Sequence, residues 1–253
     1  MGSGSNGKWH PTGFWPDFCS WPGFCIDYVT IDLLHCGDLG INLYLLASLF
    51  IELFTMLGGV MSRCAEGLSE LLFYIKLAAK QLGQKRSPIN KLTMHMMKGA
   101  FENAPKSKLK GSESRHTVHC MNWILEHIFP PQTPYERVRQ LCVKSLSEFY
   151  ASLYVWDNGD IRGRTDALHH GHRFMVFYSE LHNSHGPDSV LYRWYPKFHQ
   201  FQHLLERQVP FQGNPTNFWC YHDESTIGEC SKLAEAGHSL THHREVLKKG
   251  RLL

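Results

Sequence analysis

The feature that most constrains this chain is the apolar run from Leu39 to Val60, in which the strongly polar side chains are Asn42 and Glu52. The length and hydrophobicity of this run approach those of a transmembrane helix. A carboxylate at Glu52 would cost at least about 2 kcal/mol inside hydrocarbon, and no basic cluster precedes the run. We therefore expect a core helix that the rest of the chain covers. A membrane-associated helical protein anchored by residues 39–60 is the weaker alternative.

A strand-and-turn signal precedes the apolar run. Tyr28 to Ile31 is a short aromatic and β-branched stretch, which predicts a buried strand that ends on Asp32. Gly37 and Gly40 then predict a turn before a helix over residues 41–57. An acid at the carboxyl end of a buried strand lies where α/β folds place ligands and catalytic groups. The alternative is that Asp32 simply caps the helix.

The composition is that of an ordinary globular protein. The chain has 253 residues, 43% hydrophobic and 19% charged, which is enough to bury a substantial core. A formal net charge of +3 is weak evidence for a polyanion partner, because the basic residues cluster only locally. The eight cysteines are scattered and no signal peptide is recognisable, which predicts reduced thiols in an intracellular protein.

Cysteine and histidine side chains form two loose groups that could hold zinc. Neither group has the two-residue spacing of a zinc knuckle or ribbon. We therefore favour buried free thiols over structural zinc in both. The groups are Cys19, Cys25, His35 and Cys36 near the start of the chain, and Cys220, His222 and Cys230 near its end.

The middle of the chain predicts a helical array. Residues 65–82 place apolar side chains at helical spacing, and Thr133, Pro134 and Glu136 form the start signal of a later helix. That later helix is expected to bury an inner face made of Val138, Leu141, Cys142, Ser145, Phe149 and Leu153. The predicted helices cover residues 41–57, 65–82, 89–101, 115–128, 134–156 and 165–181.

Two sequence blocks resemble one enzyme family. The first block is Asp-x-x-His followed after three residues by Leu-Gly, at Asp32, His35, Leu39 and Gly40. The second block comprises Tyr195 to His199, His203, Gly213 to Pro215, Phe218, Trp219, Glu224 and Gly228. Together they resemble DDE transposases of the CACTA type and their relatives. Those proteins are similar to retroviral integrases in having an RNase H-like core.

The resemblance implies an α/β fold that is predominantly helical. Residues 22–60 and 190–253 would form two halves of a partial RNase H-like core, interrupted by a large helical insertion over residues 61–189. Residues 1–21 are predicted to be irregular or disordered, because Gly, Ser, Asn and Pro dominate them. The family's first catalytic Asp has no good counterpart upstream, where Asp17 and Asp27 are the only acids. We therefore expect a truncated product.

In this family the catalytic acids hold Mg²⁺ ions that activate water or a DNA 3′-hydroxyl for attack on a phosphodiester. The resemblance makes Asp32 and Glu224 the catalytic acids and the metal ligands, and hard divalent ions prefer such carboxylate oxygens. Their carboxyl groups should then lie within roughly 4–8 Å of each other. Without the resemblance, Glu224 would be a first-turn acid favoured by the helix dipole. Asp38 is expected to be a helix cap rather than an auxiliary ligand.

The partner implied by the resemblance is DNA, and no small-molecule substrate is expected. Two basic segments could contact phosphates or simply be solvated. They contain Lys106, Lys108 and Lys110 in a loop, and Arg244, Lys248 and Lys249 in a C-terminal helix. The leading hypothesis is a transposase-derived protein, ancestrally a DNA-cleaving and strand-transferring enzyme, with or without surviving activity. It would be nuclear in a eukaryote. The alternative is a non-catalytic nucleic-acid or protein interaction module.

Overall fold

The computed structural model describes residues 30–58, 64–98, 105–157, 160–186 and 188–221. These residues are predominantly helical, and all but Thr30 belong to one compact unit that starts at Ile31. The main helices are η3 (Leu34–Ile41), α1 (Asn42–Gly58), α2 (Cys64–Gln81), α3 (Gly111–His127), α4 (Pro134–Val155), α5 (Ile161–His185) and α6 (Pro196–His203). The shorter elements are η5 (Met94–Met96), β1 (Met97–Lys98), β2 (Lys106–Ser107), η6 (Leu204–Gln208), α7 (Val209–Gln212) and η7 (Pro215–Asn217).

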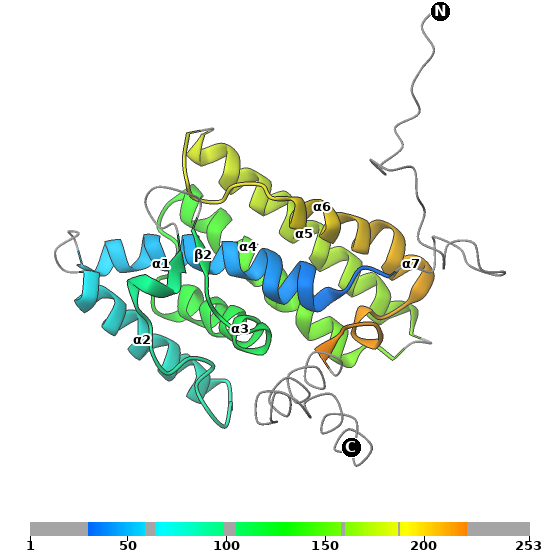
Figure 1. The fold of residues 1–253 in the computed structure, drawn as a ribbon, viewed down its shortest axis with the longest axis horizontal. Coiled ribbons are helices and arrows are strands. Elements are labelled where there is room, and N and C mark those ends of the chain that lie inside the picture. Colours follow the sequence, from blue (N-terminus) through cyan, green and yellow to red (C-terminus); the bar gives the residue numbers. More distant parts are fainter. Residues whose placement is uncertain (1–29, 59–63, 99–104, 158–159, 187, 222–253) are drawn as a thin grey trace, which may run out of the picture. The chain divides into compact units, whose positions relative to one another are not determined.

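The apolar run forms the central helix of this unit. Figure 1 shows α1 between α2 and α3 on one side and α5 and α6 on the other. The continuous helical segment Leu34–Gly58 is long and apolar enough to cross a membrane, yet 72% of its most apolar window is buried by the rest of the chain. The expectation of a covered core helix is therefore confirmed for the described residues of this run.

Helices α4 and α5 begin at the local signals that the sequence carries. The Thr133 hydroxyl accepts from the Glu136 N–H at 3.2 Å, and the Glu136 carboxylate accepts from the Thr133 N–H at 3.0 Å. This reciprocal capping satisfies two N–H groups that a helix start otherwise leaves unpaired. The Asp160 carboxylate caps α5 by accepting from the N–H groups of Arg162 and Gly163.

The predicted inner face of α4 is confirmed for most of its residues. Cys142, Ser145, Phe149 and Leu153 are buried, whereas Val138 and Leu141 are half-buried. Helix α5 contributes a matching stripe at helical spacing, made of Ala167, Phe174, Tyr178 and Leu181, each of them fully buried. A single apolar cluster joins these faces to α1, α2 and α6.

Two local predictions around Asp32 are wrong. Thr30 and Ile31 are not part of a strand, because the Ile31 N–H donates to the Gln208 side chain at 2.7 Å and the chain enters a helix at Leu33. The other half of the predicted strand, Tyr28 and Val29, lies outside the described residues. Strands β1 and β2 form a two-stranded antiparallel ribbon. An RNase H-like sheet is not among the elements of the described ranges.

The glycines expected to form a turn lie inside η3 instead. A side chain on Gly37 would meet the side chain of Leu33 and the Tyr150 hydroxyl, both at 2.9 Å. A side chain on Gly40 would meet the His35 carbonyl oxygen at 2.8 Å. Gly40 also has non-helical φ and ψ of −111° and −105°, which kinks the helix there. Both glycines therefore permit close packing. The sequence alone does not distinguish this role of glycine from its role in a turn.

The helix predicted over residues 89–101 is also wrong within the described residues. This stretch is irregular up to Thr93, and it then forms η5 and β1. Strand β1 pairs with β2 so that Met97 faces Ser107 and Lys98 faces Lys106. Non-local pairing therefore overrides the local helical pattern here.

Candidate functional site

Asp32 lies at the start of the central helical segment and caps it. Its carboxylate accepts from the N–H groups of Leu34 and His35, each at 3.1 Å, which is the hydrogen-bond pattern of an N-cap. The same carboxylate accepts from the Cys220 N–H at 3.0 Å, across 188 positions of sequence. The capping alternative is therefore the one the described geometry supports. In addition, Asp32 ties the later part of the chain to the helix start.

His35 and Cys220 complete a small group of potential ligands around Asp32. The His35 Nδ1 contacts the Asp32 Oδ2, and one potential ligand atom from each of Asp32, His35 and Cys220 lies within 4.8 Å of the other two. The His35 side chain is 45% exposed, so the group is open to solvent on that side. Burial acts to raise the pKa of Asp32, but hydrogen bonds from Cys220 and His35 outweigh it and lower the pKa below its ordinary value.

Asp38 lies six residues after Asp32 (38 − 32), inside η3, and is fully buried. The Tyr221 hydroxyl donates to its Oδ2 at 2.5 Å, and the Arg115 Nη1 lies 3.6 Å from the same oxygen. Burial raises the pKa of Asp38 to about 6, although Arg115 and the tyrosine hydroxyls act against this rise. The expectation that Asp38 caps a helix is wrong, because Asp38 lies inside η3 with its carboxylate in this buried network.

Arg115, on α3, holds the segment that follows η7. Its guanidinium lies 4.7 Å from the ring centre of Trp219, 5.1 Å from that of Tyr221 and 5.6 Å from that of Tyr154. Cation–π contacts of a largely desolvated guanidinium are worth about 2 kcal/mol or more. Together with the hydrogen bonds from Tyr221 to Asp38 and from Cys220 to Asp32, these cation–π contacts anchor residues 219–221 beside the start of the central helix.

The described parts of the two resembling blocks therefore come together. A side chain on Gly40 would lie 3.4 Å from the Lys197 side chain, so α6 approaches η3 closely at this point. The Asn214 side-chain amide donates to the carbonyl oxygens of Leu153 and Trp156, at 2.8 and 3.1 Å, and fixes the chain at the end of α4. From Asn214 the chain continues through η7 to Cys220, whose backbone N–H donates to Asp32.

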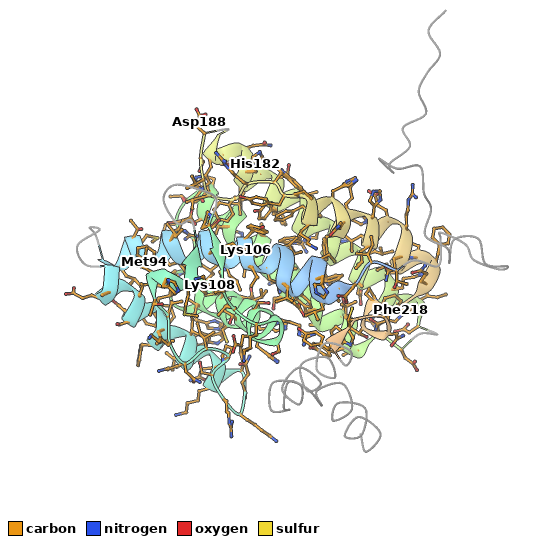
Figure 2. The ribbon with its side chains drawn as sticks, in the orientation of Figure 1. Met94, Lys106, Lys108, His182, Asp188 and Phe218 are labelled. Carbon is orange, nitrogen blue, oxygen red and sulfur yellow. The ribbon has the colours of Figure 1, made fainter. Side chains whose placement is uncertain are left out.

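The remaining predicted site residues are only partly described. Glu224, Arg244, Lys248 and Lys249 lie outside the described residues, so the Asp32–Glu224 separation stays a prediction. Lys106 is half-buried, with its Nζ 5.4 Å from the Tyr44 ring centre, whereas Lys108 and Lys110 are exposed. Figure 2 labels Lys106 and Lys108 apart from Phe218. Lys110 precedes Gly111, where a side chain would lie 2.5 Å from Leu34 and 2.6 Å from the Tyr221 hydroxyl, so this end of the loop lies beside the segment that Asp32 caps.

A second carboxylate, that of Glu52, has an 11% exposed side chain and contacts four partners that the sequence did not reveal. The Tyr135 hydroxyl contacts its Oε1, the Tyr192 hydroxyl donates at 2.7 Å, and Arg139 and His185 each approach to 3.2 Å. Burial acts to raise the pKa of Glu52, but its hydrogen bonds and the Arg139 charge lower it overall. The sequence marked Glu52 only as the one acid in the apolar run from Leu39 to Val60. Its partners come from positions 135 to 192 and show no spacing pattern.

A cavity of about 270 Å³ lies elsewhere, between the start of α5 and α7. It is lined by Trp156, Asp160, Arg164 and the segment Val209–Gly213 among others, and none of the predicted site residues belongs to it. The Asp32 group therefore remains the candidate site, because it combines three ligand types with the convergence of the two resembling blocks. No protein family, curated protein or solved structure matches this chain.

Proposed function

We propose that this protein derives from a CACTA-type DDE transposase and that Asp32 and Glu224 are the remaining acids of its DNA-cleaving metal site. The observation that carries the proposal is the 3.0 Å hydrogen bond from the Cys220 N–H to Asp32. Glu224 follows Cys220 by four residues, and an extended chain spans at most about 3.6 Å per residue. Chain length alone therefore keeps the Glu224 backbone within about 14 Å of Cys220.

The contact between α6 and η3 supports the same proposal. The resemblance rests on sequence blocks that are far apart along the chain, and an inherited site requires them to meet in space. Lys197 of the Pro-Lys-x-His run packs against Gly40 of the first block, and Cys220 contacts Asp32. In this proposal the chain keeps helices around an ancestral RNase H-like site, whose sheet the described residues do not contain.

The donor set fits a divalent ion only in part. Asp32 is an oxygen ligand of the kind that Mg²⁺ prefers, and Glu224 would supply a second. However, the Asp32 carboxylate already accepts from three backbone N–H groups and contacts the His35 ring. An ion would have to displace at least one of these contacts. Bound Mg²⁺ would activate the attacking hydroxyl and stabilise the leaving oxygen, and the crowding of Asp32 predicts weak activity.

A DNA-nicking assay tests this proposal. The full chain should nick supercoiled DNA slowly in Mg²⁺ or Mn²⁺, and both Asp32→Asn and Glu224→Gln should abolish nicking. Asp166→Asn is the matched control, because Asp166 is half-exposed on α5 and pairs only with Arg162 among the ion pairs of the described residues. Nicking that survives Asp32→Asn, or no nicking by the wild-type chain, would refute a working Asp32–Glu224 site.

A non-catalytic nucleic-acid module is the second candidate. It is favoured by the exposed side chains of Lys108 and Lys110, which flank the start of α3 next to the half-buried Lys106. Phosphate contacts made by such lysines are sequence-independent and weaken steeply as salt rises. DNA binding without nicking, lost in a Lys108→Gln/Lys110→Gln variant, would favour this module over the enzyme.

A further inference from the structure

We infer that Asp32, His35 and Cys220 form a binding site for a borderline transition-metal ion such as Zn²⁺. The inference goes beyond the proposed function, because it assigns Asp32 to a second ion site, shared with His35 and Cys220 and independent of Glu224. It concerns His35 and Cys220, to which the resemblance gives no metal-binding role. It joins one member from each of two loose His/Cys groups that lie far apart in the sequence.

The separations suit a tetrahedral ion. Zinc binds sulfur at about 2.3 Å, imidazole nitrogen at about 2.0–2.1 Å and carboxylate oxygen at about 2.0–2.2 Å. Ligand atoms around one such ion are therefore roughly 3.3–3.7 Å apart. In the protein the three atoms all lie within 4.8 Å of one another, and an ion between them would require the direct contact of His35 Nδ1 with Asp32 Oδ2 to open.

The backbone N–H groups of Leu34, His35 and Cys220 already orient the Asp32 carboxylate. Such outer contacts are what set ligand direction in metal sites. The exposed side of His35 leaves room for a water molecule as the fourth ligand, which is the arrangement of three protein ligands plus water.

The ligand types decide between ions. Mg²⁺ demands a near-octahedral set of oxygens, and the described group offers one carboxylate, one imidazole and one thiol. Nitrogen and sulfur donors favour Zn²⁺ and related ions. The Cys220 side chain hydrogen-bonds to the Asp32 carboxylate, which places the thiol beside the oxygen ligand.

Cobalt substitution in the full chain gives a direct readout. Co²⁺ should bind with a near-ultraviolet thiolate charge-transfer band, and Cys220→Ser should remove the band. Cys220→His should keep the visible Co²⁺ bands without the thiolate band, which separates ligation from folding. His35→Gln should weaken Co²⁺ affinity about tenfold or more. Zn²⁺ should displace Co²⁺, and a large excess of Mg²⁺ should not.

Two matched controls define the site. Cys230→Ser removes a thiol ten positions later, and His199→Gln removes a histidine whose Nε2 lies 3.0 Å from that of His203. Both should leave the Co²⁺ spectrum and affinity unchanged. Co²⁺ binding without a thiolate band, or a band that survives Cys220→Ser, would overturn the inference.

The two proposals fail separately. Mg²⁺-dependent nicking that Cys220→Ser leaves intact, together with no thiolate band, would sink the transition-metal site and leave the proposed function standing. A Cys220-dependent thiolate band in a protein that nicks no DNA would do the reverse. Far-ultraviolet circular dichroism of each variant establishes that it is folded.

Discussion

Neutralising Glu52 tests how far the core depends on its buried carboxylate. The Arg139 side chain is 4% exposed and its Nη1 lies 3.2 Å from Glu52 Oε2. Tyr192 is fully buried and donates its hydroxyl to the same carboxylate. Glu52→Gln keeps the side-chain volume but leaves the Arg139 charge without its counter-charge.

The expected cost is large because the stranded charge is buried. Removing one partner of a buried ion pair destabilises a protein by about 3–5 kcal/mol. For a chain of this size, about 2–4 °C of melting temperature is lost per kcal/mol, so the shift should be roughly 6–20 °C. Replacing both partners, as in Glu52→Leu/Arg139→Met, should cost clearly less than the sum of the two single changes.

Urea unfolding at neutral pH, followed by circular dichroism, measures these costs. Glu126→Gln is the control, since Glu126 is an exposed acid on α3 and its neutralisation should change the free energy of unfolding by no more than about 0.5 kcal/mol. A Glu52→Gln variant within that same range of the wild type would refute the argument. Strict additivity of the Glu52 and Arg139 changes would refute it equally.

Three further outcomes are expected. Because the pKa of Asp38 is raised to about 6 in the folded protein from an ordinary 3.8, its contribution to stability is full below about pH 4 and is lost as pH rises through about 6. The wild-type minus Asp38→Asn difference in unfolding free energy should therefore fall by on the order of 3 kcal/mol between pH 4 and 7, and a flat difference would contradict this. Gly40→Ala should cost about 2 kcal/mol or more in urea unfolding, because its new methyl group would lie 2.8 Å from a backbone oxygen. If the loop lysines contact DNA, Lys108→Gln/Lys110→Gln should lower the slope of log K against log salt by up to about 1.8 in anisotropy titrations, and an unchanged slope would exclude them as phosphate contacts.

The helices were predictable where their signals are local. Thr133 and Glu136 cap α4 through residues three positions apart, so the sequence itself displays the interaction. The apolar period over residues 65–82 likewise predicts α2, whose bounds are Cys64–Gln81. Each signal depends only on neighbours within one or two helical turns, and tertiary packing agrees with it.

The glycines show where local reasoning stops. A turn signal and a close-packing glycine look identical in sequence. At Gly37 the distant partner is Tyr150, which lies 113 positions later (150 − 37) and whose hydroxyl would be 2.9 Å from an added side chain. The same holds for residues 89–98, where pairing with Lys106 and Ser107 replaces a helix. These predictions failed because the deciding partner was distant in the chain.

The candidate site combines a local sequence signal with a contact from a distant part of the chain. Asp32 was identifiable from its position before the apolar run, but its most informative contact comes from Cys220 and depends on no sequence spacing. That contact is made by a backbone N–H group, which every residue except proline carries, so residue identity could not reveal it. The thiol of Cys220 then reaches the Asp32–His35 pair because the backbone is already held there. The chemistry proposed for this site therefore depends on the path of the chain, and the Co²⁺ spectrum of the wild type and of Cys220→Ser tests it.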